Sequence, residues 1–262
     1  MNHRLYHLSG PLRQGGTQFL LFLILGVLWE LGVRFVRIPE YVLPAPSRIL
    51  RVLGSDIGSL ASDAGWTLLE ALLGFLLSMT AAMIISIVFS INQTIERHLI
   101  PYIASIQAIP IIVIAPILAI WFQSTSILPK VLMATIIALA PATAIINRGF
   151  HSASSDALDL MQSMAATRTQ VLFKLRLPSA VSYIFVAARV AATLASVGAT
   201  VAEFSSATHG IGFRIIISSY RTDTPTLFCS VLIAIGISLL MYVLVVLAER
   251  LLLWFRPFPA PL

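Results

Sequence analysis

Two charged residues, Arg189 and Glu203, interrupt or end an apolar stretch that runs from residue 179 to 202. Charged side chains inside a membrane are costly and often take part in transport. Glu203 therefore has two interpretations. It is either the proton-carrying group of a proton-coupled secondary transporter, or a carboxylate near the lipid headgroups that water or Arg214 satisfies. Arg189 must face protein or a water-filled path, and we expect it to pair with Glu203 or with a backbone carbonyl.

Three prolines, Pro110, Pro116 and Pro141, interrupt other apolar stretches. A proline removes one helical hydrogen bond and bends the helix, and the freed carbonyl is tolerated in a membrane where it lines a pathway. We expect either packed kinks that affect gating or carbonyls exposed along a pathway, and the spacing does not decide between them. Together with Arg189 and Glu203, these prolines are the candidate pathway or gating residues.

The segment 155–178 separates two apolar stretches and has the pattern of two short helices. In its first half, apolar residues recur at helical spacing, and acidic residues stand in the first turns, where they suit the helix dipole. Thr167 and Gln170 then form a capping box, which predicts that a second helix starts at Thr167. Pro178 is expected to end this second helix.

The two short helices would meet in a tight turn at Ala165 and Ala166, and the first helix would have an apolar face without a partner. Such a face suits a hairpin that lies flat on the lipid headgroups. It equally suits a docking element for a soluble subunit. Physical chemistry alone leaves both alternatives open.

Motifs for common enzyme chemistries are absent from the sequence. The two lysines are Lys130 and Lys174, and neither follows a glycine, so the phosphate-binding loop of an ATPase is missing. The five histidines and one cysteine lack metal-ligand spacing. Basic residues are scattered between apolar runs, which argues against nucleic-acid binding. We expect no catalytic residue, no metal site and no bound cofactor in this chain, which is therefore not an enzyme.

The elements that position these residues are those of a membrane protein. Of 262 residues, 58% are hydrophobic and 11% are charged, whereas a soluble domain has roughly 25% charged residues. A helix of about 20 apolar residues spans a bilayer. Six windows qualify or nearly qualify, at residues 17–36, 71–95, 99–129, 131–147, 179–202 and 224–248. The sequence predicts an all-α membrane protein with about six transmembrane helices.

These windows divide the chain into a tail (1–16), a first transmembrane helix (17–36), an external loop (37–65), a transmembrane core (66–250) and a second tail (251–262). The loop contains a short amphipathic helix that Ser47 is expected to cap. The core includes the segment 150–177. A small excess of Lys and Arg on the side of the termini favours cytoplasmic termini, and we expect a multi-pass protein of the bacterial inner membrane.

The hairpin resembles the cytoplasmic loop of ABC importer permeases. The usual pattern is Glu-Ala-Ala, three residues, Gly, nine residues, Ile, one residue, Leu-Pro. Leu175, Leu177 and Pro178 match its end, Ala165 stands where glycine is usual, and the glutamate is absent. Further matches are Leu43-Pro44-Ala45-Pro46-Ser47, Ile109-Pro110 to Ala115-Pro116, Trp121-Phe122, Lys130, Pro141, Val201-Ala202-Glu203-Phe204, Ala248-Glu249-Arg250 and Arg256-Pro257. The resemblance covers residues 40 to 257, and it is greatest to the permeases for taurine, sulfonates, nitrate, bicarbonate, pyrimidine precursors or riboflavin.

The resemblance implies a type I importer fold and a subunit that forms the translocation pathway for a small polar or anionic solute. An external substrate-binding protein would deliver the solute, and two ATP-binding cassette ATPase subunits would bind ATP and Mg. The remaining partners would be a second permease copy, forming a homodimer, and membrane lipid. In this hypothesis the 155–176 loop is the coupling element. Its expected ATPase contacts are Met164, Ala165, Ala166, Thr167, Arg168 and Gln170.

The departures from the family pattern concern Ala165 and two further residues, Gln123 and Glu70. Because Ala165 replaces the glycine of the turn, it must either adopt a right-handed conformation or strain the turn. Gln123 stands where glycine usually follows Trp-Phe, and Glu70 stands where arginine is common.

Overall fold

The computed structural model describes residues 11–123 and 125–254, and the elements in these ranges are helices. Their bounds are α1 (Pro11–Val36), α2 (Pro46–Ser55), α3 (Ile57–Ile91), α4 (Gln93–Ile106), α5 (Ile111–Phe122), α6 (Leu128–Phe150), α7 (Ser155–Ser163), α8 (Arg168–Val171), the π-helical turn η1 (Leu172–Arg176), α9 (Leu177–Ser206), α10 (Ile211–Tyr220) and α11 (Thr224–Trp254). The predicted all-α fold class is confirmed.

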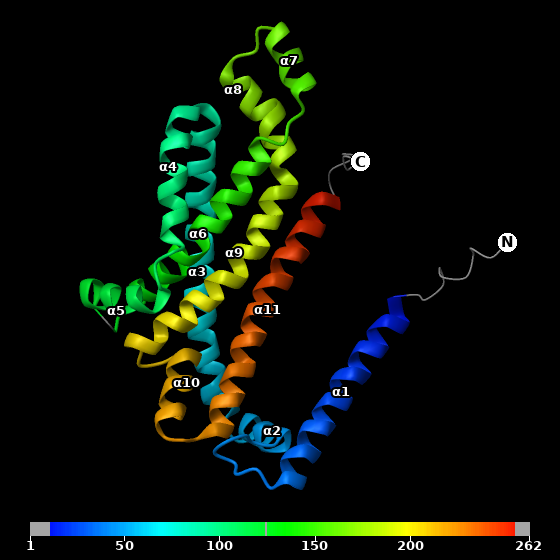
Figure 1. The fold of residues 1–262 in the computed structure, drawn as a ribbon, viewed down its shortest axis with the longest axis vertical. Coiled ribbons are helices and arrows are strands. Elements are labelled where there is room, and N and C mark those ends of the chain that lie inside the picture. The colour runs from blue at the N-terminus through cyan, green and yellow to red at the C-terminus, as the bar shows by residue number, and fades with distance from the viewer. Residues whose placement is uncertain (1–10, 124, 255–262) are drawn as a thin grey trace, which may run out of the picture.

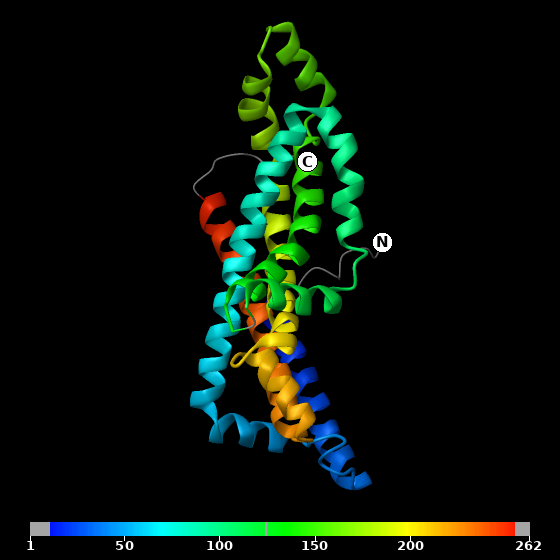
Figure 2. The same ribbon diagram turned by 90° about the vertical axis from the view of Figure 1, so that its left-hand side faces the viewer.

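Four helices of the described part are long and apolar enough to cross a membrane: α3, α6, the continuous helix that ends in α9, and α11. They run side by side along the long axis of the molecule (Figure 1). The helix α1, 26 residues long, diverges from this bundle and approaches it at the end where α2 lies. The short helices α7 and α8 form the opposite end (Figures 1 and 2).

The third expected span, placed within residues 99–129 and interrupted by prolines, does not form one membrane-spanning helix. The chain forms α4 and α5 instead, and α5 lies across the bundle in both views (Figures 1 and 2). The break falls at Pro110, which is the N-cap of α5 and has a non-helical backbone (φ −59°, ψ 117°). A proline has no N–H to donate and disfavours helix in the residue before it. Pro116 and Pro141 lie inside α5 and α6.

The centre of the bundle is lined with small side chains. Alanines of α6, including Ala134 and Ala138, pack with alanines of α9, including Ala191 and Ala195. At Gly198 of α9, an added Cβ would lie 2.7 Å from the Cα of Ala134. Small residues let helix backbones approach closely in a membrane, so this interface joins α6 and α9 tightly.

The region before the second expected span also differs from the prediction. The helix α3 begins at Ile57, whereas the sequence placed an external loop up to residue 65. Ser47 does not cap α2, because Ala45 is the N-cap and Pro46 occupies the first turn. The Ser47 hydroxyl instead donates to Glu30 Oε1 at 2.8 Å, which ties α2 to α1.

Candidate functional site

The hairpin between α6 and α9 is closed by local hydrogen bonds. Ser154 caps α7, and its hydroxyl accepts from the backbone N–H of Ala157. The predicted capping box is confirmed: the Thr167 N–H donates to Gln170 Oε1 at 2.8 Å, and the Gln170 N–H donates to the Thr167 hydroxyl at 3.3 Å. These bonds satisfy backbone groups that a helix start would otherwise leave unpaired.

The second helix of the hairpin does not end at Pro178, so that prediction is wrong. The chain continues from α8 through η1 into α9, with Pro178 in the first turn of α9. A π-helical turn shifts the hydrogen-bond register, which accommodates the missing proline N–H without breaking the helix. The hairpin is therefore continuous with a membrane-spanning helix.

The six predicted contact residues gather at the tip of the hairpin. Met164 is the C-cap of α7, Ala165 and Ala166 form the turn, and Thr167 is the N-cap of α8. Arg168 and Gln170 lie in α8. The tip is exposed and partly apolar, since Met164 is 71% exposed and Leu160 of α7 is 61% exposed. Such a surface fits a partner better than it fits water.

The turn adopts the strained alternative of the two left open by the sequence. Ala165 has a φ of +53°, in the left-handed region, and its N–H donates to the Gln162 carbonyl at 2.9 Å. This is the usual place of glycine at a helix C-terminus. An L-residue in this conformation costs roughly 1–2 kcal/mol.

We expect Ala165→Gly to stabilise the hairpin by roughly 1–2 kcal/mol relative to Ala166→Gly. The neighbouring Ala166 has no positive φ, so the two variants share the same gain of unfolded-chain freedom and differ in the strain relieved. Hydrogen exchange of the α7 and α8 amides measures the difference. Equal protection in the two variants would show that the turn is unstrained.

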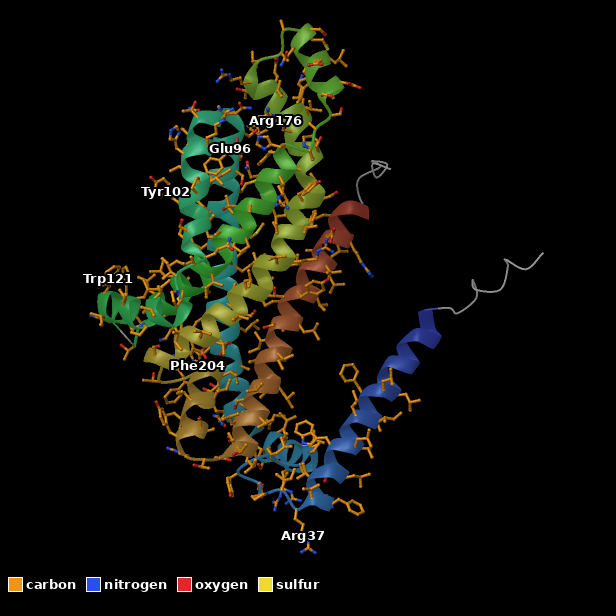
Figure 3. All side chains as sticks on the ribbon, in the orientation of Figure 1. Arg37, Glu96, Tyr102, Trp121, Arg176 and Phe204 are labelled. Atoms are coloured by element: carbon orange, nitrogen blue, oxygen red, sulfur yellow. The ribbon has the colours of Figure 1, made fainter. Side chains whose placement is uncertain are left out.

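The base of the hairpin is joined to α3. Arg176 NH1 donates to the Ser90 carbonyl at 2.6 Å and to the Ser90 hydroxyl at 2.9 Å. Figure 3 shows Arg176 between the hairpin and the upper ends of α3 and α4. A displacement of the hairpin is thus transmitted to α3 by this contact and to α9 through the continuous helix.

A second group of residues places ionisable side chains deep in the protein. Lys130 and Glu203 are fully buried and Glu70 is 1% exposed. The Lys130 ammonium donates to the Ser126 carbonyl at 2.9 Å. The Glu70 carboxyl lies near both Glu203 and Lys130, and its Oε2 has no hydrogen-bond partner among the described residues. Ionisable groups inside a membrane are costly unless they are paired, so these three residues form one electrostatic unit across α3, α6 and α9.

Three side chains of this region hold the N-terminus of α10. The backbone N–H groups of Gly210, Ile211 and Gly212 donate to Asp63 Oδ1 (3.0 Å), Thr67 Oγ1 (2.8 Å) and Glu203 Oε2 (2.5 Å), respectively. The Thr67 hydroxyl in turn donates to Glu203 Oε1 at 2.7 Å. The free N–H groups and the dipole of a helix start favour such acidic partners.

Space at this contact admits only glycine. Gly210 has a φ of +107°, and an added Cβ there would meet the Glu203 carboxylate at 2.3 Å. At Gly212 an added Cβ would lie 2.2 Å from the Thr200 carbonyl oxygen. Both glycines let the start of α10 lie directly on α9.

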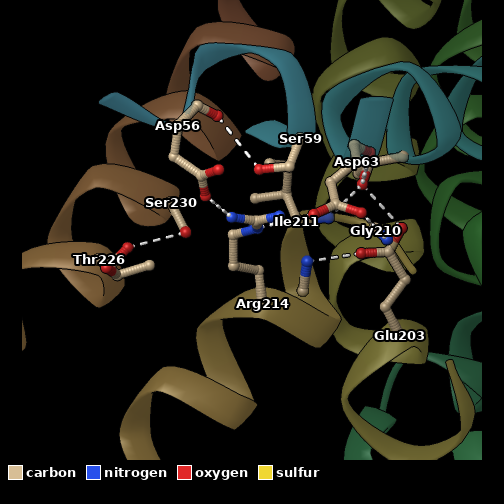
Figure 4. A network of polar contacts seen from close by, with 11 residues as sticks. Asp56, Ser59, Asp63, Glu203, Gly210, Ile211, Arg214, Thr226 and Ser230 are labelled. Atoms are coloured by element: carbon tan, nitrogen blue, oxygen red, sulfur yellow. Dashed lines mark hydrogen bonds and ion pairs between the residues drawn. The ribbon is translucent and has the colours of Figure 1, made fainter. Parts of the chain in front are cut away.

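Arg214 extends the network towards the end of the molecule that contains α2. Its Nε donates to Asp63 Oδ2 at 2.6 Å, and NH1 pairs with Asp56 (Figure 4). Hydrogen bonds from Ser59 and Arg214 hold the pKa of Asp56 below its usual range. Asp56 therefore stays ionised at neutral pH, and Arg214 joins α10 to the start of α3.

The expected pairing of Arg189 with Glu203 and the expected pairing of Glu203 with Arg214 are both wrong. Arg189 pairs with Glu249 of α11, with NH1 and Oε2 3.5 Å apart. Arg189 and Glu203 are 14 residues apart on one helix, a rise of about 21 Å, so they cannot meet. Arg214 does not pair with Glu203, because its guanidinium pairs with Asp63 of α3 and with Asp56 at the N-cap of α3.

A cavity of about 270 Å³ lies between α3, α4 and α6. Its walls are mostly apolar, with Phe89, Ile100 and Ile103 among them, and Asn147 contributes a polar group. The Asn147 amide donates to Glu96 Oε1 at 2.7 Å, and its buried Oδ1 has no hydrogen-bond partner among the described residues. The bond between Asn147 and Glu96 joins α6 to α4 along one wall of the cavity.

Sequence reasoning missed the acidic side of this network. Asp56, Asp63, Thr67 and Glu70 are separated by seven, four and three residues, which is the spacing of one helix face. This periodicity was visible in the sequence. The expected loop up to residue 65 concealed it.

Comparison with known proteins identifies the family to which this chain belongs. Residues 74–257 match the model of the family described as "Binding-protein-dependent transport system inner membrane component". This chain belongs to that family. It is therefore an ABC importer permease of the type I fold and a multi-pass protein of the inner membrane.

Three similar proteins illustrate the breadth of this permease family. The riboflavin transport system permease protein RibX of Chloroflexus aurantiacus is 32% identical over 242 residues, which are 90% of this chain and 88% of that protein. A probable ABC transporter permease protein of Haemophilus influenzae is 31% identical over 223 residues, covering 84% and 91%. The formylaminopyrimidine transport permease protein ThiX of Halalkalibacterium halodurans is 29% identical, covering 90% and 94%.

Two departures of this permease from the family pattern share a left-handed backbone conformation. Ala165 and Gln123 stand where glycine is usual, and both have a positive φ, +53° and +64°. The backbone thus keeps a conformation that favours glycine although the side chains have changed.

Proposed function

We propose that this permease forms the translocation pathway for a small polar or anionic solute that an external binding protein delivers. Partner ATPase subunits bind ATP and Mg and grip the exposed hairpin tip around Met164 and Ala165. The observation that carries this proposal is the hairpin itself, an exposed, partly apolar tip continuous with a membrane-spanning helix. The lack of a phosphate-binding loop in the sequence supports a separate ATPase.

The proposed motion uses the hairpin as a lever. Closure of the ATPase dimer on ATP draws two hairpins together, and the continuous helix into α9 and the contact of Arg176 with Ser90 carry the displacement into α9 and α3. The ATP-bound partner must bind one conformation of the permease better than the other, because a ligand shifts an equilibrium only by its differential affinity.

In this proposal the hairpin end and both termini lie in the cytoplasm, and α2 and α10 lie at the external face. Two permease copies and two ATPase subunits form the assembly. The exposed apolar side chains of α5 support a second copy, since Ile120 is 81% and Trp121 is 72% exposed. Formylaminopyrimidine, named for one relative, is a first candidate solute.

Reconstitution in liposomes tests this proposal. The purified permease is expected to hydrolyse no ATP, and uptake of a solute from a panel of formylaminopyrimidine, riboflavin and taurine is expected to require the ATPase and the binding protein. The alternative, a proton-coupled secondary transporter that uses Glu203 or Arg189, predicts uptake driven by a pH gradient without the ATPase. ATP turnover by the permease alone, or gradient-driven uptake, would contradict the proposal.

A further inference from the structure

An open pocket of about 480 Å³ lies at the end of the molecule opposite the hairpin, between the end of α1, the connection to α2 and α2 itself. Four arginines line it: Arg34, Arg37, Arg48 and Arg51. We propose that this pocket binds the phosphodiester headgroup of an anionic lipid of the outer leaflet. The inference rests on the proposed orientation, with the hairpin in the cytoplasm.

The charges of the pocket are only half neutralised. Arg34 pairs with Glu30 and Arg48 pairs with Glu40, the latter with Nε and Oε1 3.5 Å apart. Within the described residues, Arg37 and Arg51 form no ion pair. Two guanidinium groups are therefore available to a phosphate, for which their planar donor geometry is well suited.

The backbone at Arg37 supports a role for this side chain. Arg37 follows α1 with a φ of +55°, and the Ile38 N–H donates to the Val33 carbonyl at 3.1 Å. Glycine is the usual residue at this helix-ending position, and an arginine there is under strain. Figure 3 shows Arg37 directed away from the bundle at the end where α1 and α2 meet.

The surroundings favour a lipid over an acidic protein surface. Large apolar side chains beside the arginines are exposed, with Phe35 at 86%, Val36 at 72% and Leu50 at 65%. A short helix with apolar and basic faces suits the boundary between headgroups and acyl chains. Arginines are normally sparse in the external loops of membrane proteins, so four of them between residues 34 and 51 call for an anionic ligand.

Native mass spectrometry of the permease–ATPase complex tests the proposal with phosphatidylglycerol and phosphatidylcholine as probes. The wild-type complex is expected to retain phosphatidylglycerol preferentially. Arg37→Gln and Arg51→Gln are each expected to reduce the retained phosphatidylglycerol about fivefold, the effect of roughly 1 kcal/mol per arginine near anionic lipid. Arg221→Gln, which removes an exposed charge at the same end but outside the pocket, is expected to leave retention unchanged.

Equal retention of the two lipids, or equal loss in the Arg221 variant, would overturn the lipid site. Retention of phosphatidylglycerol in the Arg37→Gln/Arg51→Gln double variant together with weaker association of the binding protein would also overturn it and assign the arginines to that protein. Labelling of a Tyr41→Cys variant by a membrane-impermeant maleimide reports the orientation separately. A failure of the proposed orientation is thus distinguished from a failure of lipid binding.

Discussion

Replacement of Glu203 by alanine is expected to lower the free energy of unfolding by about 3–5 kcal/mol, the usual effect of removing one member of a buried charge group. The Glu203 carboxylate is fully buried and accepts hydrogen bonds from Thr67 and from the Gly212 N–H. Its loss leaves these donors without their acceptor and removes a carboxyl group from the surroundings of buried Lys130. Thermal unfolding of the purified permease–ATPase complex measures the effect.

The matched control is Glu40→Ala. Glu40 pairs with Arg48 at 3.5 Å but is 48% exposed, and exposed ion pairs contribute at most about 1 kcal/mol. A Glu203→Ala variant as stable as the Glu40→Ala variant would show that the buried network does not hold α10 in place.

Glu203→Gln separates the structural role of Glu203 from proton transport. The glutamine amide keeps one acceptor oxygen, but its NH₂ group replaces the second. This NH₂ group would face either the Thr67 hydroxyl or the Gly212 N–H, and both of these groups donate to Glu203 in the wild type. Partial destabilisation without any change in the pH dependence of uptake is therefore the expected result. A stably folded Glu203→Gln variant that loses a proton-dependent step would favour the secondary-transporter alternative.

The long helices could be predicted because a long apolar stretch of sequence indicates a helix surrounded by lipid. The windows at 131–147 and 224–248 lie inside α6 and α11, and the capping box at Thr167 fixed the start of α8 through bonds within four residues. Local chemistry of this kind is visible in a sequence. The hairpin is accordingly predictable from the sequence, except for the continuation through Pro178.

The buried network could not be predicted in the same way. The contacts that α3 and its N-cap make with α9 and α10 join residues 136 to 158 positions apart, such as Thr67 with Glu203 and Asp63 with Gly210. Hydropathy placed Lys130 in a connection, whereas the packing of α6 against its neighbours buries this residue completely. The mean hydropathy of a sequence window depends on composition and not on the helix face on which a charge lies. The pairing of Arg189 with Glu249 could therefore not be predicted either.

The second large effect is expected at the hairpin tip, where Ala165→Asp should abolish uptake while the permease remains folded. Ala165 has a left-handed backbone, and aspartate tolerates that conformation better than most residues other than glycine. The substitution therefore leaves the turn intact and places a negative charge on the surface that the ATPase is proposed to cover. A buried, unpaired charge at a protein interface weakens association strongly.

Ala165→Asn is the matched control, because asparagine has the same shape and the same tolerance for a left-handed backbone without the charge. Co-purification of the ATPase, its stimulation by the solute-loaded binding protein and solute uptake should all fall much further in the aspartate variant than in the asparagine variant. Equal losses in both would mean that side-chain volume at the tip, rather than charge, disrupts the contact. Full coupling in the Ala165→Asp variant would mean that the partner does not grip the hairpin at Ala165, and the lever mechanism would then need another point of contact.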